Sequence, residues 1–567
     1  GFLGNLGEMK VISDAWVFLG SQGKALQDLS LSQRIVSLFK GIGATFKGQS
    51  LPIPPGNWYW NPSRTIPGEP ITEFPYFTFL YGDLHAHLIA LPIVMCSVGW
   101  SLSLLFQKIE LGGAKLKHII GLIINFIVGA LIIGALKPTN TWDVYTFFAL
   151  AACVLVYIIM RYGVGLKLPK TREWQSRLVF SVIAVGLLYG LSMLMYNAFN
   201  SHFMPGFTKI GFWEGDRTPI TSYFLHWGLP LFILVGWFIW ESIKWAKDTK
   251  ISELRALKHF NQLMLAIAIA SVALLIVLLT LKVSVAIIAL PMCVWALLLL
   301  LSHRQSDSKR FVFFIIGTAF LLTLVVELVH LVGDIGRMNV VFKLYMQAWL
   351  LMNIAAGTAL VIMLNERHLW KERTQLVFCV PLLVLFLFAL LFPIFASRDK
   401  ATDRISLEAP HTLDGMKYME SASYHLDGIR MDLGEDYRAI MWLQENVVGS
   451  PVILEAQAFE YQWGNRFTVY TGLPSVVGWN YHQRQQRAIW ANNDVWDRVD
   501  RVNHFYQTID IDFVKEYLKE HKVSYIVVGQ QERIRYYGEG LDKFETYLGQ
   551  LWDMVYTEGD TVIYKVR

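Results

Sequence analysis

Charged residues are scarce in this chain. Asp, Glu, Lys and Arg make up 17% of its 567 residues, whereas apolar residues make up 54% and occur in long runs. A soluble protein has about 25% charged and about 45–50% apolar residues, so the composition excludes a disordered chain and an ordinary soluble enzyme. The net charge of +5 is small for this length and indicates no nucleic-acid-binding surface. The sequence therefore predicts an integral membrane protein.

Cysteine is equally scarce, with four residues in the whole chain. Each falls in an apolar run, which excludes a disulfide scaffold and favours packing roles for Cys96, Cys153, Cys293 and Cys379. The sequence also lacks a P-loop, a Rossmann glycine fingerprint, a zinc-protease helix and a serine-nucleophile elbow. These absences argue against an ATP-driven pump and against a nucleotide-cofactor enzyme.

Long apolar runs are what the chain has in abundance. About 20 apolar residues are needed to cross a hydrocarbon core of ~30 Å, so each uninterrupted run near that length is predicted to form one transmembrane span. The short separator TLKVS leaves a buried re-entrant pair as an alternative to two spans over 260–301. In all, the runs predict ten transmembrane helices, at roughly residues 87–107, 118–136, 142–160, 178–198, 224–243, 260–281, 283–301, 311–332, 341–364 and 375–396.

The loops between these runs alternate in charge. Lys and Arg concentrate in every second loop, and cytoplasmic loops are the ones that collect them. The predicted protein sits in the plasma membrane, with an extracytoplasmic loop region of short helices (1–86), a transmembrane helical domain (87–396) and an extracytoplasmic soluble domain (397–567). The opening GFLGNLGE resembles the end of a membrane helix and starts without methionine, which predicts that residues are missing upstream.

The segment after Arg398 has a different pattern. Helical periodicity in EDYRAIMWLQENV and DIDFVKEYLKEHK alternates with the short strands PVILEA and VSYIVVG. A hairpin is predicted around Glu558, Gly559 and Asp560, because both flanking arms alternate apolar and polar residues. This order predicts a compact α/β domain.

Polar residues at the predicted outer face are the candidate functional residues, because ionisable groups near a membrane core are costly to insert. The first cluster is EFPYFTFLYGDLHAH, which leads into the first span. Asp83, His85 and His87 could together hold a metal ion, with His85 and His87 on one side if that stretch is extended. In the alternative interpretation, Asp83 caps the helix and the histidines lie at headgroup level.

The second cluster is KPTNTWDVY, between the second and third predicted spans. Asn140 or Thr141 could cap the third helix, and Trp142 suits the membrane interface. Asp143 then lies just inside the helix, where the helix dipole favours an acid. Asp143 is therefore either a structural residue or part of a substrate site.

The third cluster runs from Glu327 to Trp349 and carries two cations near the outer face. Lys343 stands about one turn inside a predicted span, where an unpaired ammonium is unfavourable by about 3 kcal/mol. Arg337 and Lys343 together would suit a phosphate or pyrophosphate. The alternative is an internal salt bridge to Asp334 or Glu327.

The C-terminal domain adds the loop TGLPSVVGWNYHQRQQR. Its aromatic and hydrogen-bonding side chains, Trp479 and His482 among them, suit a carbohydrate or lipid-phosphate surface. A solvated loop or a contact with the membrane would use the same residues.

Seven segments, taken together and in order, resemble one known family. The segments are YWNPSRTIPG, EFPYFTFLYGDLHAH, TNTWD, NVVFKLYMQAW, PVILEAQ, TGLPSVVGW and YIVVGQQERIRYYG. They are similar to the YYY-type multi-pass membrane proteins, an uncharacterised prokaryotic family, and the resemblance runs over nearly the whole chain. The tyrosine triplet that names the family, and an acidic DF segment before it, are expected in a region upstream of this sequence.

That family in turn resembles the GT-C class of membrane glycosyltransferases. The resemblance implies transfer of a sugar from a polyprenyl-phosphate donor to a glycan, lipid or protein acceptor at the outer face, with membrane lipid as a further partner. A GT-C enzyme keeps its catalytic carboxylate in the first outer loop, which would lie upstream of this chain.

The residues in this chain receive hypothetical roles on that basis. Asp83 and His85 would be catalytic, His87 would join them in binding a divalent metal such as Mg or Mn, and Lys343 would hold phosphate. A transporter or flippase, and a metal-dependent outer-face hydrolase, are the alternative functions. The substrate-binding set would comprise Arg337, Lys343, Asp334, Asp143, Trp479 and His482.

Overall fold

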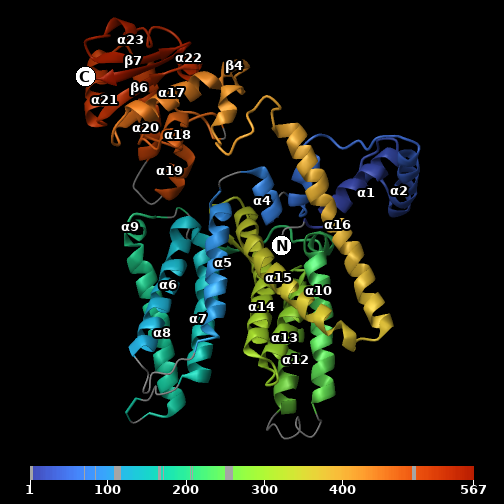
Figure 1. Ribbon diagram of the computed structural model, residues 1–567. Helices are drawn as coiled ribbons and strands as arrows, with labels where there is room; N and C mark the ends of the chain where they lie inside the picture. The colour runs from blue at the N-terminus through green and yellow to red at the C-terminus, as the bar shows by residue number, and fades with distance from the viewer. Residues whose placement is uncertain are drawn as a thin grey trace. The chain divides into compact units, whose positions relative to one another are not determined.

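The computed structural model describes residues 4–68, 70–82, 85–107, 116–163, 168–169, 171–204, 206, 209–249, 260–460, 462–487 and 493–567. The chain divides into two compact units. One comprises Gly1–His202 with Lys209–Asp403, and the other comprises Arg404–Arg567 with Phe203–Thr208. The first unit is a helical bundle and the second contains small β-sheets (Figure 1).

The first unit begins with a helical hairpin and a run of short elements. The hairpin helices cross closely, since a Cβ on Gly41 would lie 1.9 Å from the carbonyl oxygen of Trp16. The backbone N–H of Gln33 donates to the side-chain oxygen of Ser30, Oγ, and this bond caps the second hairpin helix. The elements are α1 (Gly7–Gly20), η1 (Leu26–Asp28), α2 (Leu31–Phe46), α3 (Asn57–Trp60), η2 (Asn61–Ser63) and α4 (Pro75–Tyr81).

Long apolar helices follow, and nine of those in the described residues are long and apolar enough to cross a membrane. Short elements join some of them, namely α9 (Asn197–Asn200), β1 (Ile210–Phe212), which pairs with β2 (Val329–Leu331), and η3 (Arg367–Leu369). The long helices are α5 (Ala86–Leu104), α6 (Leu116–Thr139), α7 (Thr141–Tyr162), α8 (Glu173–Met195), α10 (Ile220–Asp248), α12 (Phe260–Thr280), α14 (Asp307–Leu328), α15 (Met338–Glu366) and α16 (Glu372–Arg404).

The prediction of ten spans is corrected at 283–301. This run forms α13 (Ala286–Leu301), whose 16 residues extend about 24 Å, short of a ~30 Å hydrocarbon core. The first three residues of the run form a turn instead, after Lys282, which has φ of +62°. In that turn Ser284 Oγ donates to the carbonyl of Thr218 at 3.1 Å. A run of the right length therefore yields a helix that is too short for a simple span.

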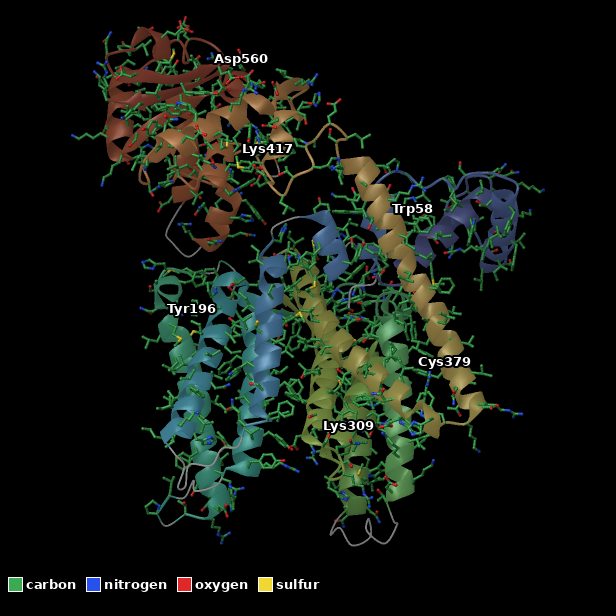
Figure 2. All side chains as sticks on the ribbon, in the orientation of Figure 1. Trp58, Tyr196, Lys309, Cys379, Lys417 and Asp560 are labelled. Atoms are coloured by element: carbon green, nitrogen blue, oxygen red, sulfur yellow. The ribbon has the colours of Figure 1, made fainter. Side chains whose placement is uncertain are left out.

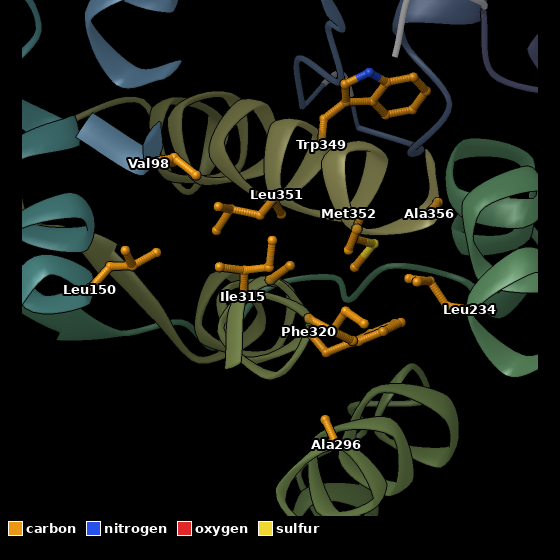
Figure 3. Close-up of a cluster of buried hydrophobic side chains, with 14 of the residues drawn as sticks. Val98, Leu150, Leu234, Ala296, Ile315, Phe320, Trp349, Leu351, Met352 and Ala356 are labelled. Carbon is orange, nitrogen blue, oxygen red and sulfur yellow. The ribbon is translucent and has the colours of Figure 1, made fainter. Parts of the chain in front are cut away.

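Helices α14 and α15 form the centre of the bundle. Helix α14 packs against α13 and α15, and α15 packs against α10. Figure 3 shows Ile315 and Phe320 of α14 facing Leu351 and Met352 of α15, with side chains of the flanking helices around them. All four are buried, so the two helices that carry the third polar cluster are fixed by apolar packing on both sides.

One end of the bundle is closed by paired charges. Lys309 and Trp58 lie toward opposite ends of the bundle (Figure 2). Lys309 Nζ lies 2.8 Å from Glu241 Oε1, and Lys244 Nζ lies 2.6 Å from the same oxygen and 2.7 Å from Glu366. Both lysines at this end therefore have carboxylate partners, which tie α10 to α14 and α15.

The second unit is built on a four-stranded sheet in the order β5-β6-β8-β7. Strands β5 and β6 are parallel, and β6, β8 and β7 are antiparallel neighbours. Side chains of β6 alternate: Tyr525 and Val527 pack with α17, whereas Ile526 and Val528 pack with α20 and α21. The strands are β5 (Val452–Leu454), β6 (Val523–Val528), β7 (Trp552–Glu558) and β8 (Thr561–Val566), with a separate hairpin of β3 (Ser423–Leu426) and β4 (Ile429–Asp432).

The predicted helix, strand and hairpin segments of this unit are present. Helices cover both faces of the sheet, which is why β6 is apolar on both sides. The helical elements are η4 (Lys417–Glu420), α17 (Leu433–Asn446), α18 (Arg466–Thr471), α19 (Asn480–Gln486), α20 (Asp494–Gln507), α21 (Ile511–Glu520), α22 (Gln530–Arg535) and α23 (Lys543–Thr546).

A buried arginine joins the elements of this unit. Arg466 is 1% exposed and lies 2.8 Å from both Asp436 and Glu532 and 3.8 Å from Glu455. Burial raises the pKa of Asp436 and Glu455, and Arg466 opposes that rise. The pKa of Glu532 is lowered overall, because Arg466 and two backbone N–H donors outweigh the effect of its burial. Three carboxylates thus share one guanidinium in a dry interior.

Candidate functional site

The first polar cluster lies where the N-terminal segment meets the helical bundle. Glu73 lies two residues before α4, and the C-cap of α4 is Gly82, whose φ of +72° allows the chain to turn there. Helix α5 begins after His85, which has extended backbone angles. This turn brings His87, in the first turn of α5, back beside Glu73.

Glu73 and His87 form the centre of the candidate site. His87 Nε2 lies 3.3 Å from Glu73 Oε2, and Arg64 lies 3.9 Å from the other oxygen of Glu73. His87 is 4% exposed, and neither ring nitrogen has a hydrogen-bond partner with proper geometry among the described residues. Its ring meets Phe342 edge to face at a centroid distance of 4.5 Å. The imidazole is therefore buried beside a carboxylate, with its ring oriented by Phe342.

Lys343 of α15 brings a cation to the same place. Its ammonium lies within electrostatic range of the carboxylates of Glu73 and Asp143. It also lies within electrostatic range of the His87 ring. The Nζ atom stands 4.6 Å from the Phe342 ring centroid. In the described part of the chain, Lys343 has no carboxylate within salt-bridge distance and no hydrogen-bond acceptor. This contrasts with Lys244 and Lys309 at the other end of the bundle.

Asp143 is held on the other side of this lysine. Its two carboxylate oxygens accept from Asn140 Nδ2 at 2.9 Å and from Gln347 Nε2 at 2.8 Å. Gln347 is fixed in turn by Thr146, whose Oγ1 donates to its carbonyl oxygen at 2.6 Å. Asn140 stands at the N-cap position of α7 but makes no side-chain capping bond. Asp143 is thus a buried acid one helix away from Lys343, with both oxygens oriented.

Arg337 is occupied by an internal pair. Arg337 Nη1 lies 2.8 Å from Glu327 Oε1, and both side chains are buried. Thr218 donates to Glu327 through its backbone N–H at 2.9 Å and through its hydroxyl at 2.5 Å. Of the two alternatives for Arg337, this geometry favours the salt bridge. Asp334, in the loop before α15, instead accepts two bonds of 2.9 Å from Asn339 Nδ2 in the first turn of that helix.

A groove beside α1 leads toward the same cluster. It encloses about 370 Å³ and is lined along α1 by residues from Gly7 to Phe18, and across from them by Asn61 and Arg64. Arg64 thus borders the groove and approaches Glu73 as well. Polar and apolar side chains share this lining.

Glu8, adjacent to that lining, is a second buried acid. Its side chain is fully buried, and neither carboxylate oxygen has a hydrogen-bond partner in the described residues. Burial raises the pKa of Glu8 to about 9, and the carboxylate of Asp399 adds to the rise. Glu8 therefore carries its proton at neutral pH.

The remaining predicted site residues lie elsewhere. Asp83 falls outside the described residues. Trp479 and His482 belong to the second unit, where their rings are 6.5 Å apart at the start of α19 and Trp479 is 39% exposed. Trp479 borders a small hollow there.

The sequence analysis missed four residues of this site. Glu73 lies beside His87, Arg64 lies near Glu73, and Asn140 and Gln347 orient Asp143. An acid within the aromatic run EFPYF was the one available signal for Glu73. Gln347 has no local signal, because its role depends on a contact with α7.

A comparison with known families places the protein. The family model described as "Uncharacterized membrane protein (DUF2298)" matches residues 1–352, more than half of the chain. The chain belongs to this family. A search of curated proteins finds no match. The matched region contains the complete cluster of Glu73, His87, Asp143 and Lys343, whereas the second unit lies beyond it.

Proposed function

We propose that this family member is a membrane glycosyltransferase that moves a sugar from a polyprenyl-phosphate-linked donor to an acceptor. The observation that supports this most is the ammonium of Lys343, which has no salt-bridge partner among the described residues and lies beside two acids and a buried histidine at one end of the bundle. A cation without a partner in a membrane helix is costly, at about 3 kcal/mol, and an anionic ligand would offset that cost. A lipid-linked phosphate is an anion that reaches a membrane protein from the bilayer.

The proposed reaction exchanges one bond at the anomeric carbon of the donor sugar. The bond between the anomeric carbon and the donor phosphate breaks, and both electrons leave with the phosphate oxygen. Lys343 offsets the negative charge that develops there. The acceptor hydroxyl forms the new bond to the anomeric carbon and gives its proton to a carboxylate, for which Glu73 and Asp83 are the candidates. Asp143, Gln347 and Asn140 would orient the donor.

The long contacts of Glu73 suit this role. Its oxygens lie 3.3 Å from His87 and 3.9 Å from Arg64, and the hydroxyl of Thr78 donates at 3.3 Å. A carboxylate held this loosely keeps lone pairs available to an incoming hydroxyl. His85 would act beside it, and Trp479 and His482 of the second unit remain proposed substrate-binding residues, as the family resemblance implies.

Asp83, His85 and His87 remain the proposed ligands if a divalent metal is used. The described residues fit Mg or Mn poorly. They form no group of three His, Cys, Asp or Glu suited to a metal, and these metals favour oxygen over imidazole ligands. Lys343 also places a positive charge beside His87, and this charge would repel a metal cation bound there. No step of the proposed reaction depends on a metal.

The groove beside α1 supports a lipid-linked substrate. The apolar side chains of its mixed lining, including Val11, Ala15 and Phe18, suit a hydrocarbon chain, and Arg64 borders the groove and approaches Glu73. The charge of the loops supports the plasma membrane and an outward-facing site, with the C-terminal unit outside.

The test is mass spectrometry of lipids that co-purify with the full chain from native membranes. The proposal predicts enriched polyprenyl phosphate or its sugar-linked form, lost in Lys343→Met but kept in Lys282→Met. Lys282 is exposed in the loop before α13, which contacts Thr218 at the same end of the bundle. Equal lipid content in all three proteins would contradict the proposal.

The Glu73→Gln variant separates transfer from transport. If Glu73 is the base of a transferase, the Glu73→Gln variant should accumulate intact sugar-linked donor. The wild type should instead carry more sugar-free lipid phosphate. The Asp83→Asn variant applies the same criterion to the other candidate base. A flippase would show the same lipid ratio in all of these proteins, because it breaks no bond.

A further inference from the structure

Helix α2 exposes a continuous apolar stripe. Leu31, Ile35, Phe39 and Phe46 are 75%, 49%, 68% and 89% exposed. They are spaced at i, i+4, i+8 and i+15, and Ile42 at i+11 continues the row, so they lie along one side of the helix. Such a row is unfavourable in water and indicates a surface with a partner.

A different side of α2 packs against α1, and this contact fixes the orientation of the helix. Ser37, Gly41 and Thr45 follow each other at i, i+4 and i+8 on the side that meets α1. Trp16 Nε1 donates to Thr45 Oγ1 at 3.1 Å, and Gly41 lets the two backbones approach closely. The apolar stripe therefore cannot turn inward against α1.

The charges on α2 and in the segment that follows it have one sign. From Leu29 to Gly68 the chain contains Arg34, Lys40, Lys47 and Arg64 and no Asp or Glu. Lys40 and Lys47 are exposed, and both lie off the apolar stripe. An apolar stripe flanked by basic residues is the pattern of a helix that lies in a membrane interface.

The hairpin is also attached at the right level. The backbone N–H of Leu6, just before α1, donates to the carbonyl of Leu225 at 2.7 Å, in the second turn of the membrane helix α10. Within the first unit, α1 and α2 project to one side of the bundle (Figure 1). The hairpin thus leaves the bundle near the end of a span, where the headgroup layer begins.

From these observations we infer that α2 lies in the plane of the bilayer surface and binds anionic lipid. The apolar stripe enters the boundary between headgroups and acyl chains, and Lys47 contacts the anionic headgroups. This holds the α1–α2 hairpin, and the groove beside α1, at the membrane surface. The inference does not depend on the proposed enzymatic activity.

The test uses the full chain in lipid nanodiscs of phosphatidylcholine with a minority of phosphatidylglycerol. After replacement of the native cysteines, a single cysteine at Phe39→Cys carries an environment-sensitive fluorophore. Lys40→Cys, the neighbouring exposed position off the stripe, is the matched control. Nitroxide lipids with the spin label near the top of the acyl chain act as quenchers.

The fluorophore at position 39 should be blue-shifted and quenched at least about threefold more than at position 40, since an interfacial helix buries its apolar face about 5–10 Å deep. Spin-labelled phosphatidylglycerol should quench more than spin-labelled phosphatidylcholine. A water-like, unquenched spectrum at position 39 would overturn the inference. A blue shift without quenching would also overturn it, because protein would then cover the stripe. Equal quenching by the two lipids would overturn the anionic assignment.

Discussion

Replacement of Arg466 by methionine tests the charge balance inside the C-terminal unit. The substitution leaves Asp436, Glu455 and Glu532 buried without their shared cation. Loss of one partner from a buried ion pair costs about 3–5 kcal/mol. In a unit of about 170 residues, each kcal/mol shifts the melting temperature by about 2–4 °C, so we expect a fall of roughly 6–20 °C.

The same variant makes a prediction about pH. Without Arg466, burial should raise the pKa of all three carboxyls, including Glu532, whose pKa Arg466 lowers in the wild type. A folded state with raised carboxyl pKa values keeps protons that the unfolded chain releases, so its stability falls as pH rises above about 4.5. The difference in melting temperature between variant and wild type should therefore widen from pH 5 to pH 8.

Differential scanning calorimetry of the full chain in detergent measures this difference, with hydrogen exchange of β6 assigning the transition. Arg501→Met is the matched control, because Arg501 pairs with Glu520 on the surface and such pairs contribute about 1 kcal/mol or less. A fall in melting temperature for Arg466→Met no larger than that of the control would refute the reasoning. A difference that narrows with rising pH would refute the assignment of the carboxyl pKa values.

Three further substitutions probe the first unit. Glu8→Gln should raise stability by about 2–4 kcal/mol at pH 7.5 and leave it unchanged at pH 4.5, because the folded chain keeps the Glu8 proton up to a pKa of about 9; thermal melts at both pH values measure this, and equal effects would contradict it. Gly41→Ala should speed hydrogen exchange in α2, since its Cβ has no room, whereas Gly43→Ala has open space and should slow it; identical exchange would contradict the close crossing. Arg337→Met should lower stability by about 3–5 kcal/mol by leaving Glu327 unpaired, and an unchanged melting temperature would contradict the buried pair.

The sequence predicted the elements that depend on local pattern. Apolar runs located the long helices and the short strand β6, and alternation located the hairpin of β7 and β8, because these signals lie within a few consecutive residues. The error at 283–301 has the same basis. Run length alone does not show that Ser284 bonds to Thr218, which makes the start of the run a turn.

The candidate site depends on contacts between distant segments. Lys343 was predicted to need an anion, but its position beside Glu73 and Asp143 follows from how α15 packs on α7 and on the N-terminal segment. For Arg337 the sequence left a phosphate and a salt bridge open, and the decision comes from the end of α14, where Glu327 faces it. Periodicity gives the face of a helix and not the identity of its neighbour.

Binding of polyprenyl phosphate to Lys343 is the central claim, and a paired-ligand titration in nanodiscs tests it most directly. Undecaprenyl phosphate and the uncharged undecaprenol would be titrated against the wild type, Lys343→Met and Lys282→Met. A charge-assisted bond contributes about 1.5–3 kcal/mol, so the wild type and Lys282→Met should prefer the phosphate by about 10–100-fold. Lys343→Met should bind both ligands alike. Equal affinity of the wild type for the phosphate and the alcohol would contradict the account.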